Sequence, residues 1–277
     1  MSRFAQLSIV GIGPQKTATT WLAQVLDGSN GICLPAQVKE TFFWDRNFTK
    51  GEGWYFRHFS GEGQKTEMAP TYFSAPEAVA RLHAHNPQLK ILTTLRDPAD
   101  RAYSLYLHHF RKGRTRKGFR DAIADFPEIL EASHYSTYLP MWLNAFGPAQ
   151  VLVLLQDDIE HAPEAVLSQL GAFLDADISA NHVDVRQRVN AGGQPRSQNL
   201  AALSTKFAET LRALGLYRVI NYAKALGLKK YIYGASGATL PPLNQADRAW
   251  LVSMFEADIG YVENLLSVTL DQWRRVN

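Results

Sequence analysis

The residues best suited to chemistry lie near the start of the chain, in a segment rich in glycine and hydroxyl groups. Residues 13–22, GPQKTATTWL, place Lys16 beside threonines at the start of a predicted helix. Backbone N–H groups at a helix start and the positive end of the helix dipole bind phosphate or sulfate, and Lys16 adds a full charge. The segment therefore predicts an anion-binding loop.

This loop is close to the phosphate-binding motif of nucleotidases but differs from it in spacing. That motif ends in Gly-Lys-Ser/Thr, whereas Lys16 follows Gln15 here. A glycine-containing strand-to-helix turn with one lysine also occurs in many α/β proteins that bind no phosphate. For the loop taken alone, this alternative stays open.

A second group of polar residues follows the apolar run 90–95. Arg96 comes directly after this predicted strand, and the Asp-Pro pair at 97–98 supplies an N-cap and a first helical proline. Ser104 then lies in the second turn of the helix, where side chains lean toward the N-terminus and its hydroxyl can point toward Arg96. The two side chains could bind a phosphate together. Alternatively, Arg96 pairs with Asp100 and Ser104 is an ordinary helix serine.

Three carboxylates stand near predicted strand ends. Glu40 lies in residues 39–45, KETFFWD, where a charged pair leads into three aromatic side chains. This pattern favours a carboxylate at the wall of an apolar pocket, where burial raises its pKa and a nearby cation lowers it. A surface Lys-Glu pair beside a core aromatic patch is the alternative. Glu67 follows in a later strand, and Asp157 follows the run 150–155, as the magnesium-binding acid of nucleotidases does.

The elements that carry these residues alternate between strand and helix. Apolar runs at 7–12, 90–95 and 150–155 predict buried strands. The segments whose apolar residues have helical spacing are 76–85, 121–131, 135–146, 163–174, 200–228 and 245–266. This order predicts a doubly wound parallel sheet flanked by helices. Ligands of such sheets bind beyond the carboxyl ends of the strands, where Lys16, Glu40, Glu67, Arg96 and Asp157 are expected.

Composition excludes several classes of protein. The chain has 277 residues and a formal net charge of +3, too weak to indicate a nucleic-acid partner, although residues 111–120 form a basic cluster that is either anion-binding or a solvated loop. The single Cys33 excludes an intramolecular disulfide and a cysteine-based zinc site. No apolar run approaches the roughly 20 residues needed to span a bilayer, and no signal peptide is evident. We therefore expect a cytoplasmic protein.

Taken in this order, the segments resemble the sulfotransferases that use 3′-phosphoadenosine 5′-phosphosulfate (PAPS). Within that family, the chain is similar to the branch that contains the heparan sulfate sulfotransferase domains and many bacterial homologues. The segments that carry the resemblance are 13–22, 39–45, 67–73, 95–108 and 189–197. The resemblance covers residues 7 to about 200 and implies a P-loop NTPase-like α/β fold. It also implies a single domain over 1–277, with a C-terminal helical part from about 198 packed on it.

The resemblance implies a set of roles for individual residues. Lys16 would contact the bridging oxygen and the leaving 5′-phosphate, and Glu40 would be the catalytic base that deprotonates the acceptor hydroxyl or amine. Arg96 and Ser104 would bind the 3′-phosphate. The other residues expected to bind PAPS, or its product 3′-phosphoadenosine 5′-phosphate (PAP), are Gln15, Thr17, Ala18, Thr19, Thr20, Trp21, Tyr135 and Arg196, the last as a lid cation. No metal is implied, and Asp157 matches a structural acid.

Two departures from the heparan branch concern the acceptor. Phe42 stands where that branch often has histidine, and Met68 stands where it often has lysine. A glycan and a small-molecule acceptor are therefore both expected possibilities. A P-loop kinase or NTPase is a rival interpretation, but it calls for a true Gly-Lys-Ser/Thr and a magnesium acid. A non-catalytic nucleotide-binding protein is a second rival, and it would not need Glu40 beside the loop.

Overall fold

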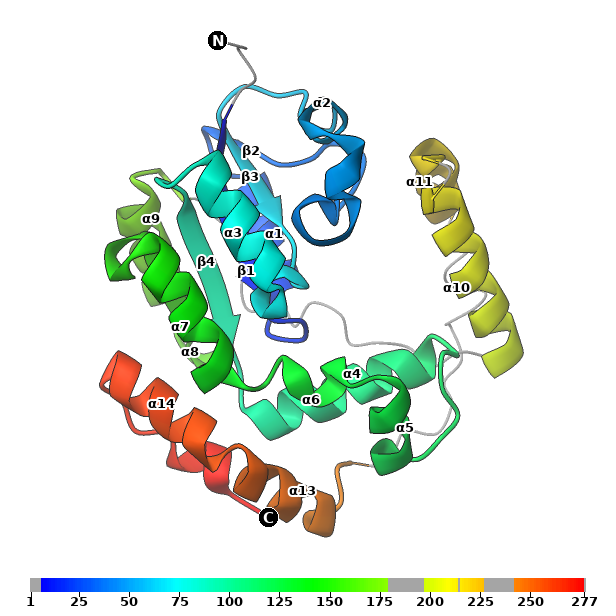
Figure 1. Ribbon diagram of the computed structural model, residues 1–277, viewed down its shortest axis with the longest axis vertical. Coiled ribbons are helices and arrows are strands. Elements are labelled where there is room, and N and C mark those ends of the chain that lie inside the picture. The colour runs from blue at the N-terminus through cyan, green and yellow to red at the C-terminus, as the bar shows by residue number, and fades with distance from the viewer. Residues whose placement is uncertain (1–5, 179–196, 214, 227–241, 277) are drawn as a thin grey trace.

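The computed structural model describes residues 6–178, 197–213, 215–226 and 242–276. Its centre is a five-stranded, all-parallel sheet in the order β2-β3-β1-β4-β5 (Figure 1). The strands are β1 (Leu7–Gly13), β2 (Ile32–Cys33), β3 (Gln64–Met68), β4 (Lys90–Leu95) and β5 (Val151–Leu155). The predicted doubly wound parallel sheet is confirmed. Because β1 is central, the loop after it lies in the middle of the strands' carboxyl edge.

Helices cover both faces of the sheet. The main covering helices are α1 (Thr19–Asp27), α3 (Pro76–His85), α7 (Tyr135–Phe146) and α9 (Pro163–Leu174). Successive strand side chains point to opposite faces. Val10 and Ile12 accordingly join the core cluster that contains α3 and α7, whereas Ile9 joins the cluster that contains α1 and α9. This two-sided burial explains why the strands are continuous apolar runs.

The structure divides several of the predicted helical segments into shorter helices. The predicted helix 121–131 forms α5 (Phe119–Asp125) and α6 (Glu128–Glu131), because Pro127 lacks the N–H that a continuous helix needs. The terminal helix forms α13 (Gln245–Met254) and α14 (Glu256–Leu266), which meet at Phe255. The region predicted as 200–228 contains α10 (Gln198–Ala213) and α11 (Tyr217–Ala225), with Gly215 at a φ of 73° between them.

The remaining elements are short. They are α2 (Glu52–Phe56), α8 (Gln156–His161), η1 (Phe43–Asn47), η2 (Phe48–Lys50), η3 (Tyr72–Ser74), η4 (Pro148–Gln150) and η5 (Asp271–Arg274). In Figure 1, α10 and α11 stand to one side of the sheet, whereas α13 and α14 pass beneath α4 (Pro98–Arg111) and α7. Over the described ranges, no helix has both the length and the apolar character that crossing a membrane requires.

Helix α4 (Pro98–Arg111) begins where the sequence predicts. Asp97 is its N-cap, and the Asp97 carboxylate accepts hydrogen bonds from the backbone N–H groups of Ala99 at 2.9 Å and Asp100 at 3.2 Å. Arg248 on α13 donates to Asp97 at 2.5 Å and to Asp100 at 2.9 Å. The C-terminal helices are therefore fastened to the start of α4. The single-domain organisation over 1–277 stays a prediction.

Candidate active site

The loop between β1 and α1 has an unusual backbone at two positions. Lys16 and Ala18 have φ angles of 73° and 65°, in the left-handed region that residues other than glycine rarely adopt. Thr17 between them is fully buried; its hydroxyl donates to the Pro14 carbonyl oxygen at 2.6 Å and shares a 2.8 Å hydrogen bond with the Thr94 hydroxyl. The Thr17 side chain therefore fastens the loop to β4, which differs from the open cradle position expected from the sequence.

A buried arginine supports the loop from behind. Arg101 on α4 is fully buried, and its guanidinium donates to the carbonyl oxygens of Gln15 at 3.4 Å and Ile129 at 2.5 Å, and to the Ser133 hydroxyl at 2.5 Å. Burial lowers the pKa of Arg101 to about 10, so the side chain stays charged at neutral pH. Arg101 was not among the predicted site residues. Its position three residues before Ser104, on the same side of the helix, is a signal that could have found it.

Within the described chain, the charges of three cations act on Lys16: Arg111, Arg96 and Lys39. Burial, and next the charges of Arg111, Arg96 and Lys39, lower the pKa of Lys16 to about 8. The Lys39 ammonium also donates to the Thr20 hydroxyl at 2.9 Å. Cations that repel one another in this way are stabilised when an anion binds between them. The electrostatics are those of an anion site.

Among the described residues, the guanidinium of Arg96 has one long contact, with Asp100. Its Nη2 atom is 3.5 Å from Asp100 Oδ2, while Arg248 holds the other Asp100 oxygen at 2.9 Å. The alternative pairing of Arg96 with Asp100 is therefore long and worth little. Tyr135, predicted to contact the nucleotide, is fully buried, and its hydroxyl donates to the Arg96 carbonyl oxygen at 2.7 Å. In this structure Tyr135 supports the Arg96 backbone from the protein side.

One face of α4 runs past the loop. Ser104, His108 and Arg111 are spaced i, i+4 and i+7, so they share this face, and all three are half-buried. Burial, and next the charge of Lys16, lower the pKa of His108 to about 3, so the imidazole is neutral. His108 and Arg111 were not predicted as site residues. Their helical spacing from Ser104 is the signal that could have found them.

Glu40 lies next to the same loop. Lys39 connects the two: its Nζ atom is 2.9 Å from Thr20 Oγ1 and 3.9 Å from Glu40 Oε1. The Glu40 side chain is 22% exposed. Burial raises the pKa of Glu40, whereas the charges of Lys39, Arg212 and Arg46 lower it. Lys39 thus lies between the Glu40 carboxylate and the Thr20 hydroxyl of the loop.

Comparison with known proteins identifies the family to which this arrangement belongs. Residues 8–191, more than half of the chain, match the family model for the sulfotransferase domain. The chain belongs to the sulfotransferase family. The predicted family is thereby confirmed.

Curated relatives of this sulfotransferase include the bifunctional heparan sulfate N-deacetylase/N-sulfotransferase 1 of two animals. The Caenorhabditis elegans protein is 31% identical over 182 residues, covering 59% of this chain and 21% of that protein. The Xenopus tropicalis protein is 33% identical over 196 residues, covering 62% of this chain and 22% of that protein. The match thus spans about a fifth of these relatives.

A solved structure shares the fold of this sulfotransferase. The crystal structure of a sulfotransferase from Alicyclobacillus acidocaldarius superposes with a TM-score of 0.67 and covers 98% of this chain and 100% of that one. The two sequences are 22% identical. This similarity supports the P-loop-like α/β fold.

A second carboxylate of the sulfotransferase lies behind Glu40. Glu67 on β3 is fully buried and accepts four hydrogen bonds: from the Thr41 N–H at 3.0 Å, the Thr41 hydroxyl at 2.5 Å, the Tyr55 hydroxyl at 2.9 Å and the Tyr72 hydroxyl at 3.1 Å. Burial raises the pKa of Glu67, and these hydrogen bonds lower it. Because Thr41 follows Glu40 directly, Glu67 fixes the backbone that carries Glu40 to a strand paired with β1.

Other predicted site residues have different surroundings. Thr19 and Trp21 are 7% and 4% exposed at the start of α1. Asp157 accepts a hydrogen bond from the Trp273 indole N–H at 2.9 Å, which gives it a structural contact with the C-terminal segment. Arg196 lies outside the described residues, so its role as a lid cation stays a prediction.

The basic segment 111–120 divides into two parts. Most of its charged side chains have protein partners: Arg114 with Glu209, Arg116 with Asn199, Lys117 with Asp125, and Arg120 with Asp247. Arg111, by contrast, is the cation that acts most strongly on Lys16. The paired side chains therefore have structural contacts, and an anion-binding role for the segment stays a prediction.

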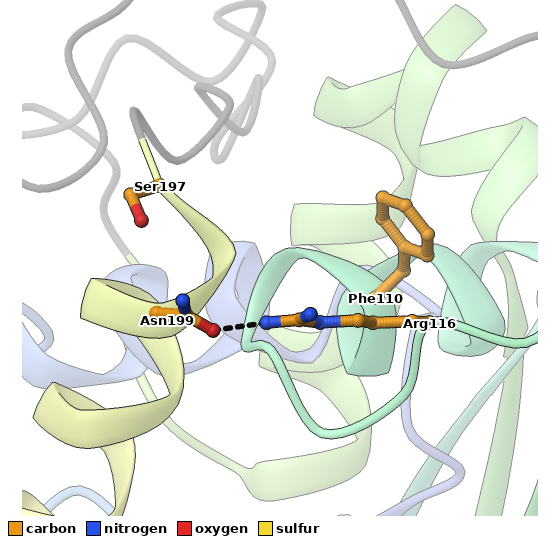
Figure 2. Close-up of a pocket in the computed structure, with 4 residues that line it drawn as sticks. All are labelled: Phe110, Arg116, Ser197 and Asn199. Atoms are coloured by element: carbon orange, nitrogen blue, oxygen red, sulfur yellow. Dashed lines mark hydrogen bonds between the residues drawn. The ribbon is translucent and has the colours of Figure 1, made fainter.

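A cavity of about 290 Å³ lies where the basic segment meets α10, and Figure 2 shows four residues that line it. Phe110, Arg116, Ser197 and Asn199 line it, and Arg116 points toward the Asn199 side-chain oxygen, to which it donates a hydrogen bond. The Thr205 hydroxyl also donates to the carbonyl oxygen of Lys112 at 3.1 Å. These contacts fasten α10 to the end of α4.

Proposed function

We propose that this sulfotransferase transfers the sulfuryl group of PAPS to a hydroxyl or amine of its acceptor, with Glu40 as the general base. The observation that supports this best is the position of Lys39, in contact with Thr20 of the anion loop and 3.9 Å from Glu40. Sulfuryl transfer needs a cation on the leaving oxygen and a base on the entering one. We assign the first role to Lys16 and the second to Glu40.

In an in-line displacement, these two side chains account for the charge of the leaving group and for the proton of the acceptor. The acceptor oxygen or nitrogen forms a bond to sulfur as the bond between sulfur and the bridging oxygen breaks. The leaving 5′-phosphate of PAP keeps that electron pair, and Lys16 stabilises its charge. Glu40 takes the proton of the acceptor. Arg96 and Ser104 bind the 3′-phosphate and so hold the donor in line.

The environment of Glu40 suits a base at neutral pH. Burial raises its pKa and makes the carboxylate more basic, whereas the charges of Lys39 and Arg212 lower the pKa. Both effects act on the same carboxyl group. We infer that Glu40 is ionised before transfer and gains its proton during it.

The heparan sulfate relatives favour a glycan amine as the acceptor, and the charges of Arg46 and Arg212 near Glu40 would suit an acidic glycan. Phe42 and Met68 depart from the pattern of that branch, so a small-molecule acceptor is the alternative. A cytoplasmic location stays a prediction.

Calorimetric titration with PAP, against ATP with magnesium, tests the donor. We expect tight PAP binding that does not depend on metal, and little response to ATP. Magnesium-dependent ATP binding without PAP binding would contradict the proposal and favour the P-loop kinase interpretation.

A further inference from the structure

Helix α4 presents polar side chains to the donor site along most of its length. Ser104 lies in its second turn, and Arg111 is its last residue. Seven residues of α-helix rise about 10 Å, so Arg111 lies about that far along the axis from Ser104 on the same face. His108 lies between them. Arg96, just before the helix, and Ser104 occupy one end of this face, and Arg111 occupies the other.

Among the residues that the structure describes, the other arginines of the segment 111–120 have partners, and Arg111 does not. Arg114, Arg116 and Arg120 contact Glu209, Asn199 and Asp247. Over the residues that the structure describes, the half-buried Arg111 guanidinium makes no hydrogen bond or ion pair. A cation withdrawn from water without a partner is costly unless a ligand provides the opposite charge.

We propose that Arg111 binds the 5′-phosphosulfate end of the donor beside Lys16, at the opposite end of the α4 face from the residues that hold the 3′-phosphate. This inference rests on the proposed function, since it takes the donor to be a 3′-phosphorylated nucleotide.

The chemistry of the two ends supports this division. Each end of PAPS carries about 1.5 to 2 negative charges at neutral pH. In this proposal Arg96 and Ser104 serve the 3′ end, and Lys16 and Arg111 serve the 5′ end. A guanidinium donates through a planar fork that matches two oxygens of one phosphate, which a lysine cannot do. The influence of Arg111 on the pKa of Lys16 agrees with this position.

Three stable nucleotides separate the two ends without any acceptor. PAP carries both phosphates, 5′-AMP carries only the 5′-phosphate, and 3′-AMP carries only the 3′-phosphate. We would titrate each by calorimetry into the wild-type protein and into Arg111→Ala, Arg111→Lys and Arg96→Ala. Arg120→Ala is the matched control, because it removes the same charge from the same segment while its guanidinium already contacts Asp247 and lies over Trp250.

We expect Arg111→Ala to weaken PAP and 5′-AMP by about 10- to 100-fold and to leave 3′-AMP within about twofold. Arg96→Ala should show the reverse preference between the two monophosphates. Arg111→Lys should recover part of the loss, and Arg120→Ala should leave all three affinities nearly unchanged.

Unchanged PAP and 5′-AMP affinity in both Arg111 variants, or an equal loss for 3′-AMP, would overturn the inference. Failure of the wild-type protein to bind PAP is a different result, because it would remove the proposed donor itself.

Discussion

Lys16 and Glu67 are both charged side chains drawn out of water near the same edge of the sheet, but their surroundings differ. Lys16 faces Arg111, Arg96 and Lys39, and burial with these cations lowers its pKa to about 8. Glu67 instead accepts four hydrogen bonds. The Glu67 carboxylate thus has hydrogen-bond partners within the protein. The cations around Lys16 repel one another and are stabilised when an anion binds. Ligand-dependent effects should therefore concentrate at the loop.

The largest loss of activity should follow from mutation of Lys16. We expect Lys16→Ala to abolish transfer, because in the proposed mechanism the Lys16 charge stabilises the leaving phosphate. The measurement is sulfuryl transfer from labelled PAPS to any acceptor that the wild-type protein sulfates. Urea unfolding should show no loss of stability, since the mutation removes a repelled cation. If the variant kept most of its activity, the cations around Lys16 would not be the part of the site on which transfer depends.

A smaller loss should follow from Glu40→Gln. The amide keeps the size of the side chain but cannot take a proton, so turnover should fall by about 10²- to 10⁴-fold. Its affinity for PAP by calorimetry should stay within about twofold. Glu62→Gln, at an exposed position, is the control. If Glu40→Gln left turnover intact, the site would be a binding site without this base.

Mutations of the donors to Glu67 should change the stability of the protein more than its affinity for nucleotide. Tyr55→Phe and Tyr72→Phe each remove one donor to the buried Glu67 carboxylate. Each should lower the free energy of unfolding by about 1–3 kcal/mol, measured by urea denaturation. PAP affinity should change little. A large loss of PAP affinity with unchanged stability would contradict the distinction between the surroundings of Lys16 and those of Glu67.

The smallest expected effect is the uptake of protons when PAP binds. PAP should raise the lowered pKa of Lys16, so at pH 8 its binding should be accompanied by uptake of up to about half a proton. Calorimetry in buffers of different ionisation enthalpy measures this uptake, and Lys16→Met should remove it. Without ligand, the unfolded chain holds the Lys16 proton between about pH 8 and 10.5 and the folded chain does not. The free energy of unfolding should therefore rise across that window relative to Lys16→Met.

Much of the fold follows from local signals in the sequence. The apolar runs predict β1, β4 and β5, and the Asp-Pro pair at 97–98 predicts the start of α4, because buried strands and helix caps depend on few neighbours. The same order places Lys16 and Arg96 at one edge of the sheet. Pro127 could have revealed the break in the predicted helix 121–131.

The finer arrangement of the site depends on side-chain directions that the sequence does not specify. The Thr17 hydroxyl points inward between two residues with positive φ, and a sequence pattern does not reveal such a backbone. Tyr135 reaches Arg96 from the buried side because of how α7 packs. Arg101 and Arg111 could be found only by following one face of α4 from Ser104 in both directions.

The clamp between Arg248 and Asp97 has a consequence for the order in which the protein is made. A chain that has left the ribosome only as far as residue 200 already contains every strand of the sheet and the loop around Lys16. It lacks Arg248, which donates to the N-cap residue Asp97 and to Asp100. Synthesis must therefore proceed through α13 before the start of α4 is secured, and a nascent chain should acquire its full nucleotide affinity only at that late stage.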